Sequence, residues 1–284
     1  NVIPDNPAVA FFCYMIEDWA DEWWWRTAMH YRWHYGEGAD FASRHLATEL
    51  LGSIPAPIWL KKIILKRRQR NGYTIGDGIT KANVAAIEEN FKNLLKNLER
   101  IFSSRRFLFG DRPSLADVGL SGPFFRHFAL DPIPLEIIRQ EAPNVLNWVS
   151  RLWSARLTNC SGTIMTGIPD DLEPLFKEIG NTYLQYLCAN IDAVNSNKKH
   201  FDIDVGSIFF KGARFSRYRV WCLSELRSHY ESIPNAFQKD VRKMLEQYGC
   251  WEPLWRHPKL PLLDNQEEGL PFKANTKMIG VYES

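Results

Sequence analysis

The stretch that decides the fold is Phe107-Leu-Phe-Gly-Asp-Arg-Pro-Ser-Leu-Ala-Asp-Val118. After the turn residues, Ser114 is suited to begin a helix, because its hydroxyl can accept a hydrogen bond from the backbone N–H three residues on. The Asp117 carboxylate can reach back to the Ser114 N–H, as Glu or Gln does in the usual capping box. The pattern predicts a structural cap formed by Ser114 and Asp117, and a helix that runs from there towards Phe128.

Helical periodicity surrounds this cap on both sides. The spacing predicts a helix over 7–33, a shorter one over 41–51, a long one over 81–103 and another that begins at Pro143. The apolar stripe of the long helix is Val84, Ile87, Phe91, Leu94, Leu95, Leu98, Ile101 and Phe102. Such a stripe is typical of a helix that packs on others, so residues 1–156 read as a helical domain.

The capped segment resembles the C-terminal domain of the glutathione transferase family, where a Phe-Leu pair, a small turn and Ser/Thr-x-x-Asp open a central buried helix. Ala142-Pro-Asn-Val-Leu-Asn-Trp148 is similar to a second helix of that family. Pro113 stands where the family often has an apolar residue, which weakens the hydrophobic staple but leaves the cap. The resemblance covers about the first half of the chain and looks like that of an enlarged bacterial-type member.

The resemblance implies that two domains have separate functions. In this family a thioredoxin-like domain holds glutathione and supplies the residue that activates its thiol. This chain does not contain such a domain, so glutathione is an expected co-substrate with its main site outside the chain, and no catalytic residue is assigned here. The helical part supplies a pocket for a hydrophobic small molecule and contacts for a homodimer.

The aromatic first helix is the candidate substrate-binding element, since the family's corresponding helix faces the active-site cleft. The candidate residues are Phe11, Phe12, Met15, Asp18, Trp19, Glu22 and Trp23. For any single ring, plain core packing is the alternative. Arg126 lies on the capped helix, which we expect to be buried, and a buried arginine needs a carboxylate partner such as Asp18, Asp21 or Glu22.

The second half of the chain has a different sequence pattern. Residues 157–284 read as a helical extension with a β-hairpin near 201–211 and an irregular tail. The fold class is therefore mainly α: a helical bundle similar to the transferase C-terminal domain, extended by helices that carry one hairpin.

Composition excludes several functions. With 35 basic and 33 acidic residues the chain is no general nucleic-acid binder, and no apolar run is long enough to span a membrane. Five scattered cysteines favour a reducing compartment, here the cytoplasm, over a disulfide scaffold. The Cys222/His229 and Cys250/His257 spacings do not suit a zinc site, so no metal is expected. The basic stretch 61–70 reads first as a solvated face, and nucleic acid, an acidic membrane or a partner are the other interpretations.

Two functions remain open. The first is the substrate-binding part of a glutathione transferase-like protein, which conjugates glutathione to a hydrophobic electrophile only together with the thioredoxin-like domain. The alternative is a non-catalytic protein-interaction module that retains the helical fold.

Overall fold

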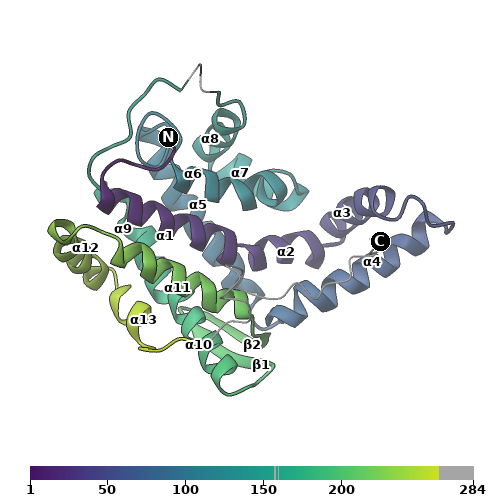
Figure 1. The fold of residues 1–284 in the computed structure, drawn as a ribbon. Helices are drawn as coiled ribbons and strands as arrows, with labels where there is room; N and C mark the ends of the chain where they lie inside the picture. The colour runs from purple at the N-terminus through teal and green to yellow at the C-terminus, as the bar shows by residue number, and fades with distance from the viewer. Residues whose placement is uncertain (157, 159, 262–284) are drawn as a thin grey trace, which may run out of the picture.

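The first helices start and stop where the local sequence dictates. A computed structural model describes residues 1–156, 158 and 160–261 (Figure 1). Asn6 Oδ1 accepts hydrogen bonds from the N–H groups of Ala8 and Val9, and Pro7 occupies the first turn of α1 (Pro7–Trp23). The predicted helix over 7–33 is two helices, because the chain breaks at Trp24 before α2 (Trp25–His34). The Trp24 ring is buried there, with its centroid 5.4 Å from that of Trp19.

Four further helices complete this bundle, of which α6 packs directly on α1. They are α5 (Val84–Ser104), α6 (Leu115–Pro123), α7 (Pro132–Glu141) and α8 (Pro143–Trp153). The predicted long helix begins at Val84 and keeps its apolar stripe inside. The capped helix α6 continues as a π-helical turn over Phe124–Phe128, directly after Pro123, which has no N–H to donate.

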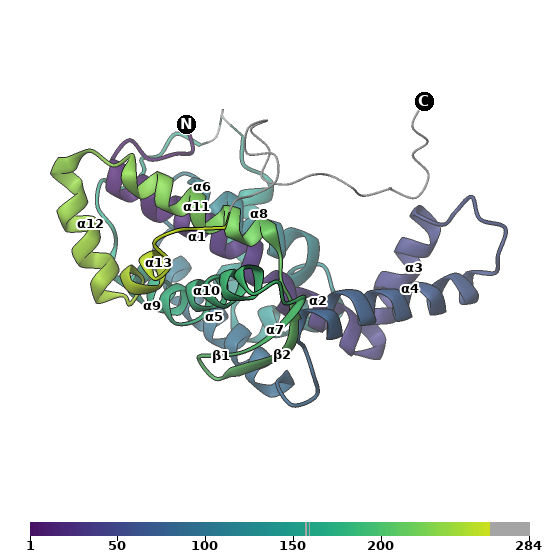
Figure 2. The same ribbon diagram turned by 60° about the horizontal axis from the view of Figure 1, so that its bottom comes forward.

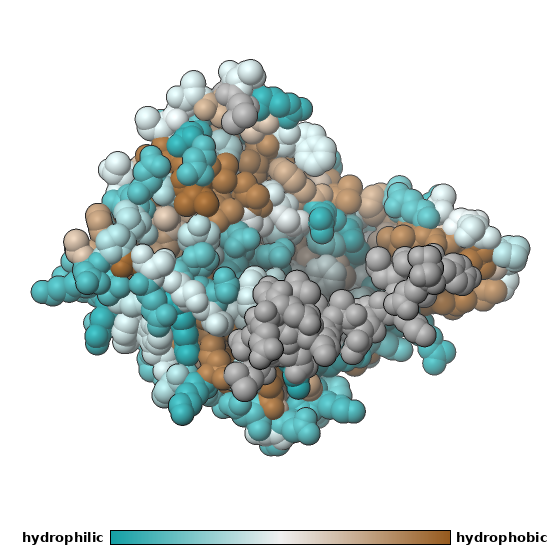
Figure 3. Space-filling view, viewed as in Figure 1, coloured by the Kyte–Doolittle hydropathy of each residue, from teal (hydrophilic) through white to brown (hydrophobic). Residues whose placement is uncertain are grey.

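A helical arm projects from this bundle. It consists of α3 (Gly36–Glu49) and α4 (Ile58–Tyr73), which pair along their length and reach away from the other helices (Figures 1 and 2). Figure 3 shows apolar surface gathered on this arm. The shorter helix predicted over 41–51 is therefore one side of a hairpin that begins earlier.

The second half adds helices and the predicted hairpin. Its helices are α9 (Glu173–Glu178), α10 (Leu184–Asn195), α11 (Arg217–Glu231), α12 (Asn235–Gln247) and α13 (Trp251–Trp255), with a π-helical turn over Ile179–Tyr183. Short 3-10 helices cover Ile75–Asp77 and Asp170–Leu172. The antiparallel strands β1 (His200–Val205) and β2 (Ile208–Arg214) turn at Gly206 and Ser207, with an irregularity between Phe201 and Ile203. The part of the predicted irregular tail from residue 262 on lies outside the described residues.

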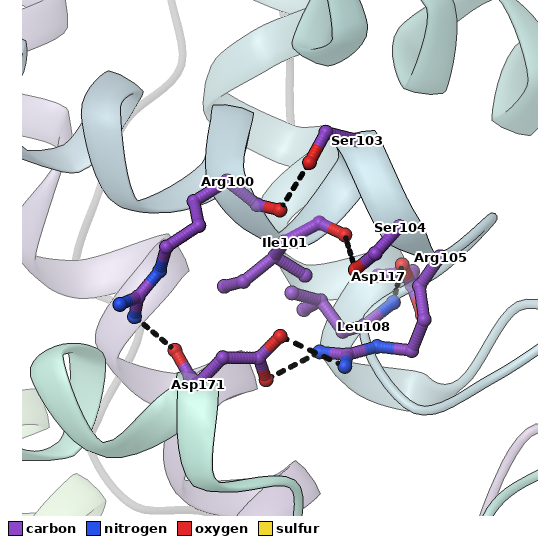
Figure 4. Close-up of polar contacts among 8 residues, drawn as sticks. All are labelled: Arg100, Ile101, Ser103, Ser104, Arg105, Leu108, Asp117 and Asp171. Atoms are coloured by element: carbon purple, nitrogen blue, oxygen red, sulfur yellow. Dashed lines mark hydrogen bonds and ion pairs between the residues drawn. The ribbon is translucent and has the colours of Figure 1, made fainter.

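Both halves share one core. Phe12 of α1 lies 4.7 Å from Phe176 of α9, measured between ring centroids, and Trp23 lies 5.8 Å from Phe210 of β2. At the end of α5, both terminal guanidinium nitrogens of Arg105 donate to the Asp171 carboxylate, at 2.9 and 2.8 Å (Figure 4). The buried residues of 157–261 therefore complete the packing of the first helices and do not form a separate core.

Candidate functional site

The Asp117 carboxylate is the structural centre of the helical domain. It is fully buried and accepts the Ser114 N–H at 2.9 Å, the Ser114 hydroxyl at 2.7 Å, the Leu108 N–H at 3.0 Å and the Trp148 indole N–H at 3.0 Å. The capping box is thus present, and two donors from other elements join it. Burial raises the pKa of Asp117, while these hydrogen bonds lower it in part. One carboxylate therefore ties the 107–110 turn, α6 and α8 together.

A glycine allows α6 to approach α1. A Cβ atom on Gly119 would lie 2.6 Å from the Cα of Glu17, closer than two such atoms can pack. The close crossing places the exposed side of α1 beside the end of α6 and its π turn. These elements, together with Trp25 at the start of α2, form the walls of a surface groove.

This groove has a volume of about 470 Å³. It is lined by Glu17, Asp21, Trp25, Val118, Gly119, Ser121, Gly122, Pro123, Phe125, Arg126 and His127. Apolar surface comes from Trp25, Val118 and Phe125, acidic groups come from α1, and Arg126 supplies a cation on the opposite wall. The arrangement suits an aromatic or apolar ligand with polar substituents.

The five apolar candidates on α1 point the other way. Phe11, Phe12, Met15, Trp19 and Trp23 are at most 3% exposed and belong to the core. Since α6 covers one side of α1 and α11 and α12 contact another, only a narrow polar face remains free. These side chains therefore pack in the core behind the groove. They fit the alternative interpretation, plain core packing, and not that of pocket residues.

Asp18 and Glu22, the two acidic candidates, line a different and smaller cavity of about 140 Å³ between α1 and α11. The Tyr183 hydroxyl donates to Asp18 Oδ2 at 2.7 Å, and Arg219 Nε lies 3.9 Å from Glu22 Oε2. Burial, partly offset by the Tyr183 hydrogen bond, raises the pKa of Asp18 to about 7. Burial also raises the pKa of Glu17 and of Glu22.

This Asp18 shift makes stability depend on pH. The carboxyl binds its proton more tightly when folded, so the stabilisation is complete below about pH 4 and is lost as pH rises to about 7. We expect Asp18→Asn, which stays neutral, to be more stable than the wild type by about 1–3 kcal/mol at about pH 8, with a smaller difference at about pH 5. Urea unfolding at both pH values measures this. Asp21→Asn, an exposed acid on the same helix, is the control, and an Asp18→Asn difference that does not change with pH would contradict the assignment.

The Arg126 prediction is wrong. Arg126 is exposed on the π turn, where it lines the groove and makes no ion pair with Asp18, Asp21 or Glu22 in the described residues. The wider π turn directs His127 and Phe128 inwards and leaves Arg126 outside. Among the described residues Arg26, Arg219 and Arg227 are the buried arginines, and Arg26 lies 3.9 Å from the centre of the Tyr186 ring.

Sequence reasoning missed most of the groove. The sequence did not single out Trp25, Val118 or Phe125, which line the groove, or Tyr183 of the second half, which contacts Asp18 outside it. The spacing of Tyr14, Glu17 and Asp21 marks the free side of α1, which Trp25 continues at the start of α2, and Gly119 marks the close crossing. Both signals are present in the sequence.

Residues 81–151 match the family model described as glutathione S-transferase, C-terminal domain. This match supports a glutathione S-transferase C-terminal domain over these residues. The matched segment runs from just before α5 to near the end of α8, and so includes the Asp117 cap and the α6 wall of the groove. At the level of the family, this transferase domain supports a glutathione transferase-like function. The comparisons with curated proteins and with solved structures gave no match.

Neither a membrane-spanning helix nor a cluster of metal ligands occurs in the described residues. None of the helices in 1–156 or 160–261 combines the length and apolar character needed to cross a membrane. In the same residues, no three His, Cys, Asp or Glu side chains gather in a way that would hold a metal ion.

Proposed function

We propose that this chain is the helical substrate-binding part of a glutathione transferase-like protein, with a hydrophobic electrophile bound in the groove between α1 and α6. The groove carries the proposal, because it places the Trp25 and Phe125 rings beside the capped helix of the transferase domain. Aromatic walls with a few polar groups are typical of sites for small organic molecules.

The charge of the groove also supports placing the electrophile there and glutathione elsewhere. Glutathione carries two carboxylates, and the α1 side of the groove carries Glu17 and Asp21. Like charges repel, so we place the electrophile in this groove and the main glutathione site on a thioredoxin-like domain. In the proposed reaction the glutathione thiolate forms a bond to the electrophilic carbon, and a leaving group such as halide departs with the bonding electron pair.

Ligand binding tests the groove. We expect Trp25→Ala to weaken binding of a chlorodinitrobenzene-type aryl halide about tenfold in calorimetry, because about 1–2 kcal/mol of apolar contact is lost. Trp59→Ala, which removes an exposed tryptophan of the arm, is the matched control and should bind as the wild type does. Equal affinity in Trp25→Ala would remove the groove from the proposal.

Activity separates this function from the alternative of a protein-interaction module. Residues 1–284 alone should not conjugate glutathione to the aryl halide, and should do so when the thioredoxin-like domain is supplied. No aryl-halide binding by any form would favour the interaction module. Turnover by residues 1–284 alone would place the thiol-activating residue in this chain.

The compartment and assembly belong to the same proposal. Cys13, Cys188, Cys222 and Cys250 are buried as free thiols, which supports a reducing compartment, the cytoplasm. A homodimer is proposed by resemblance to the family, and sedimentation velocity at increasing protein concentration tests it.

A further inference from the structure

The arm formed by α3 and α4 leaves large apolar side chains uncovered. Leu50 and Trp59 are 64% and 61% exposed at its far end. The exposed large apolar residues on the arm are Leu50, Ile54, Ile58, Trp59, Ile63, Ile64 and Tyr73. Contiguous apolar surface on a projecting element marks an interaction site rather than a solvated face.

The same arm is strongly basic. Between Glu49 and Asp77 the sequence has six Lys or Arg residues and no acidic residue. Residues 36–73 carry seven Lys or Arg against three Asp or Glu, so the rest of this nearly neutral chain is slightly acidic. Lys62 and Lys66 pair with Asp40 of α3, which fixes the two helices against each other.

The free cations lie next to the apolar residues. Trp59, Ile63 and Arg67 follow one another at intervals of four on α4, and Ile64 and Arg68 form the neighbouring row. All five are exposed. Arg67 and Arg68 have no ion pair or side-chain hydrogen bond with any other residue that the structure describes. The outer face of α4 therefore offers apolar and cationic groups side by side.

We propose that this arm binds the surface of an anionic lipid bilayer. The apolar end, with Trp59, enters the interfacial region, and Arg67 and Arg68 contact lipid phosphates. A second copy of the chain fits this face less well, because pairing α4 with itself would bring like charges together. Nucleic acid would match the charge but would leave the isoleucines and Leu50 in water.

Vesicle flotation tests the proposal with the full chain. We expect it to float with vesicles of mixed phosphatidylglycerol and phosphatidylcholine, and not with phosphatidylcholine alone. Arg67→Glu with Arg68→Glu should weaken the partition coefficient by about tenfold or more, since each basic residue contributes to attraction by the anionic surface. Lys239→Glu with Lys243→Glu makes the same change in net charge on the exposed side of α12 and should have little effect.

The apolar contribution needs its own variant. Trp59→Ala should reduce binding several-fold and reduce the quenching of tryptophan emission by brominated lipid, whereas Trp153→Ala, which removes another exposed tryptophan, should change neither. Equal binding to neutral vesicles, or equal loss in the α12 control, would overturn the proposal. So would self-association or RNA binding that the α4 variants abolish while vesicle binding is absent.

Discussion

Replacing Asp117 by alanine is expected to lower the free energy of unfolding by about 3–5 kcal/mol. Loss of a helix cap alone costs about 0.5–2 kcal/mol. Here the carboxylate also accepts the buried N–H groups of Leu108 and Trp148, and neither position offers water as a substitute partner. Each buried donor left without an acceptor costs about 1–3 kcal/mol more.

Urea denaturation of matched variants measures the effect. Ser114→Ala removes one hydroxyl donor and leaves the carboxylate with three others, so it should cost about 1 kcal/mol. Ser121→Ala changes a partly exposed hydroxyl on the same helix and should cost no more than about 0.5 kcal/mol. If Asp117→Ala were no more destabilising than Ser114→Ala, the carboxylate would be a simple cap and not the junction of three elements.

The cap could be predicted because it is local. Ser114 and Asp117 are three residues apart, and their hydrogen bonds follow from helix geometry alone. The role of Trp148 as a third partner could not be predicted, since nothing in a sequence fixes which way an indole 31 residues away will point. Sequence reasoning therefore predicted the helix start correctly and underestimated what the carboxylate does.

The apolar candidates on α1 lie in the core, on the side of the helix away from the groove. Aromatic residues were chosen on α1 as pocket residues, yet apolar rings are also what a core attracts most strongly. The interval from Glu17 to Asp21 marks the free side of α1, and Trp25 continues that side at the start of α2. What covers the rest of α1 depends on α11, which follows it in sequence by about two hundred residues and could be placed only by the structure.

Whether Arg126 and Arg26 are buried was likewise not predictable from the sequence. The prediction assumed an unbroken α-helix through 114–128, and the π turn after Pro123 changes the direction of Arg126. Arg26 was not predicted to be buried because its aromatic neighbours, Tyr186 and Phe210, come from the second half. Periodicity gave the elements reliably, whereas burial depended on contacts between distant segments.

Those contacts lead to the largest expected effect: residues 1–156 alone should not fold cooperatively. The fragment would lose Phe176 from the face of Phe12, Tyr186 from Arg26 and Asp171 from Arg105. Each uncovered large apolar side chain costs about 1.5–3 kcal/mol, and a few such losses equal the total stability of an ordinary domain, about 5–15 kcal/mol. We expect a helical fragment without a sharp thermal transition that binds a hydrophobic dye such as ANS.

Co-expression with residues 157–284 as a separate chain should restore the transition, because the missing side chains would be supplied without the covalent link. Phe176→Ala in the full chain gives a graded version of the same loss and should cost about 3–5 kcal/mol. A fragment 1–156 that unfolds cooperatively and excludes the dye would show the opposite: that the transferase domain carries its own complete core, and that the second half is an attachment to it. In that case the groove between α1 and α6 would persist without the second half, while the cavity around Asp18 would not, because α11 forms one side of it and Tyr183 holds the Asp18 carboxyl.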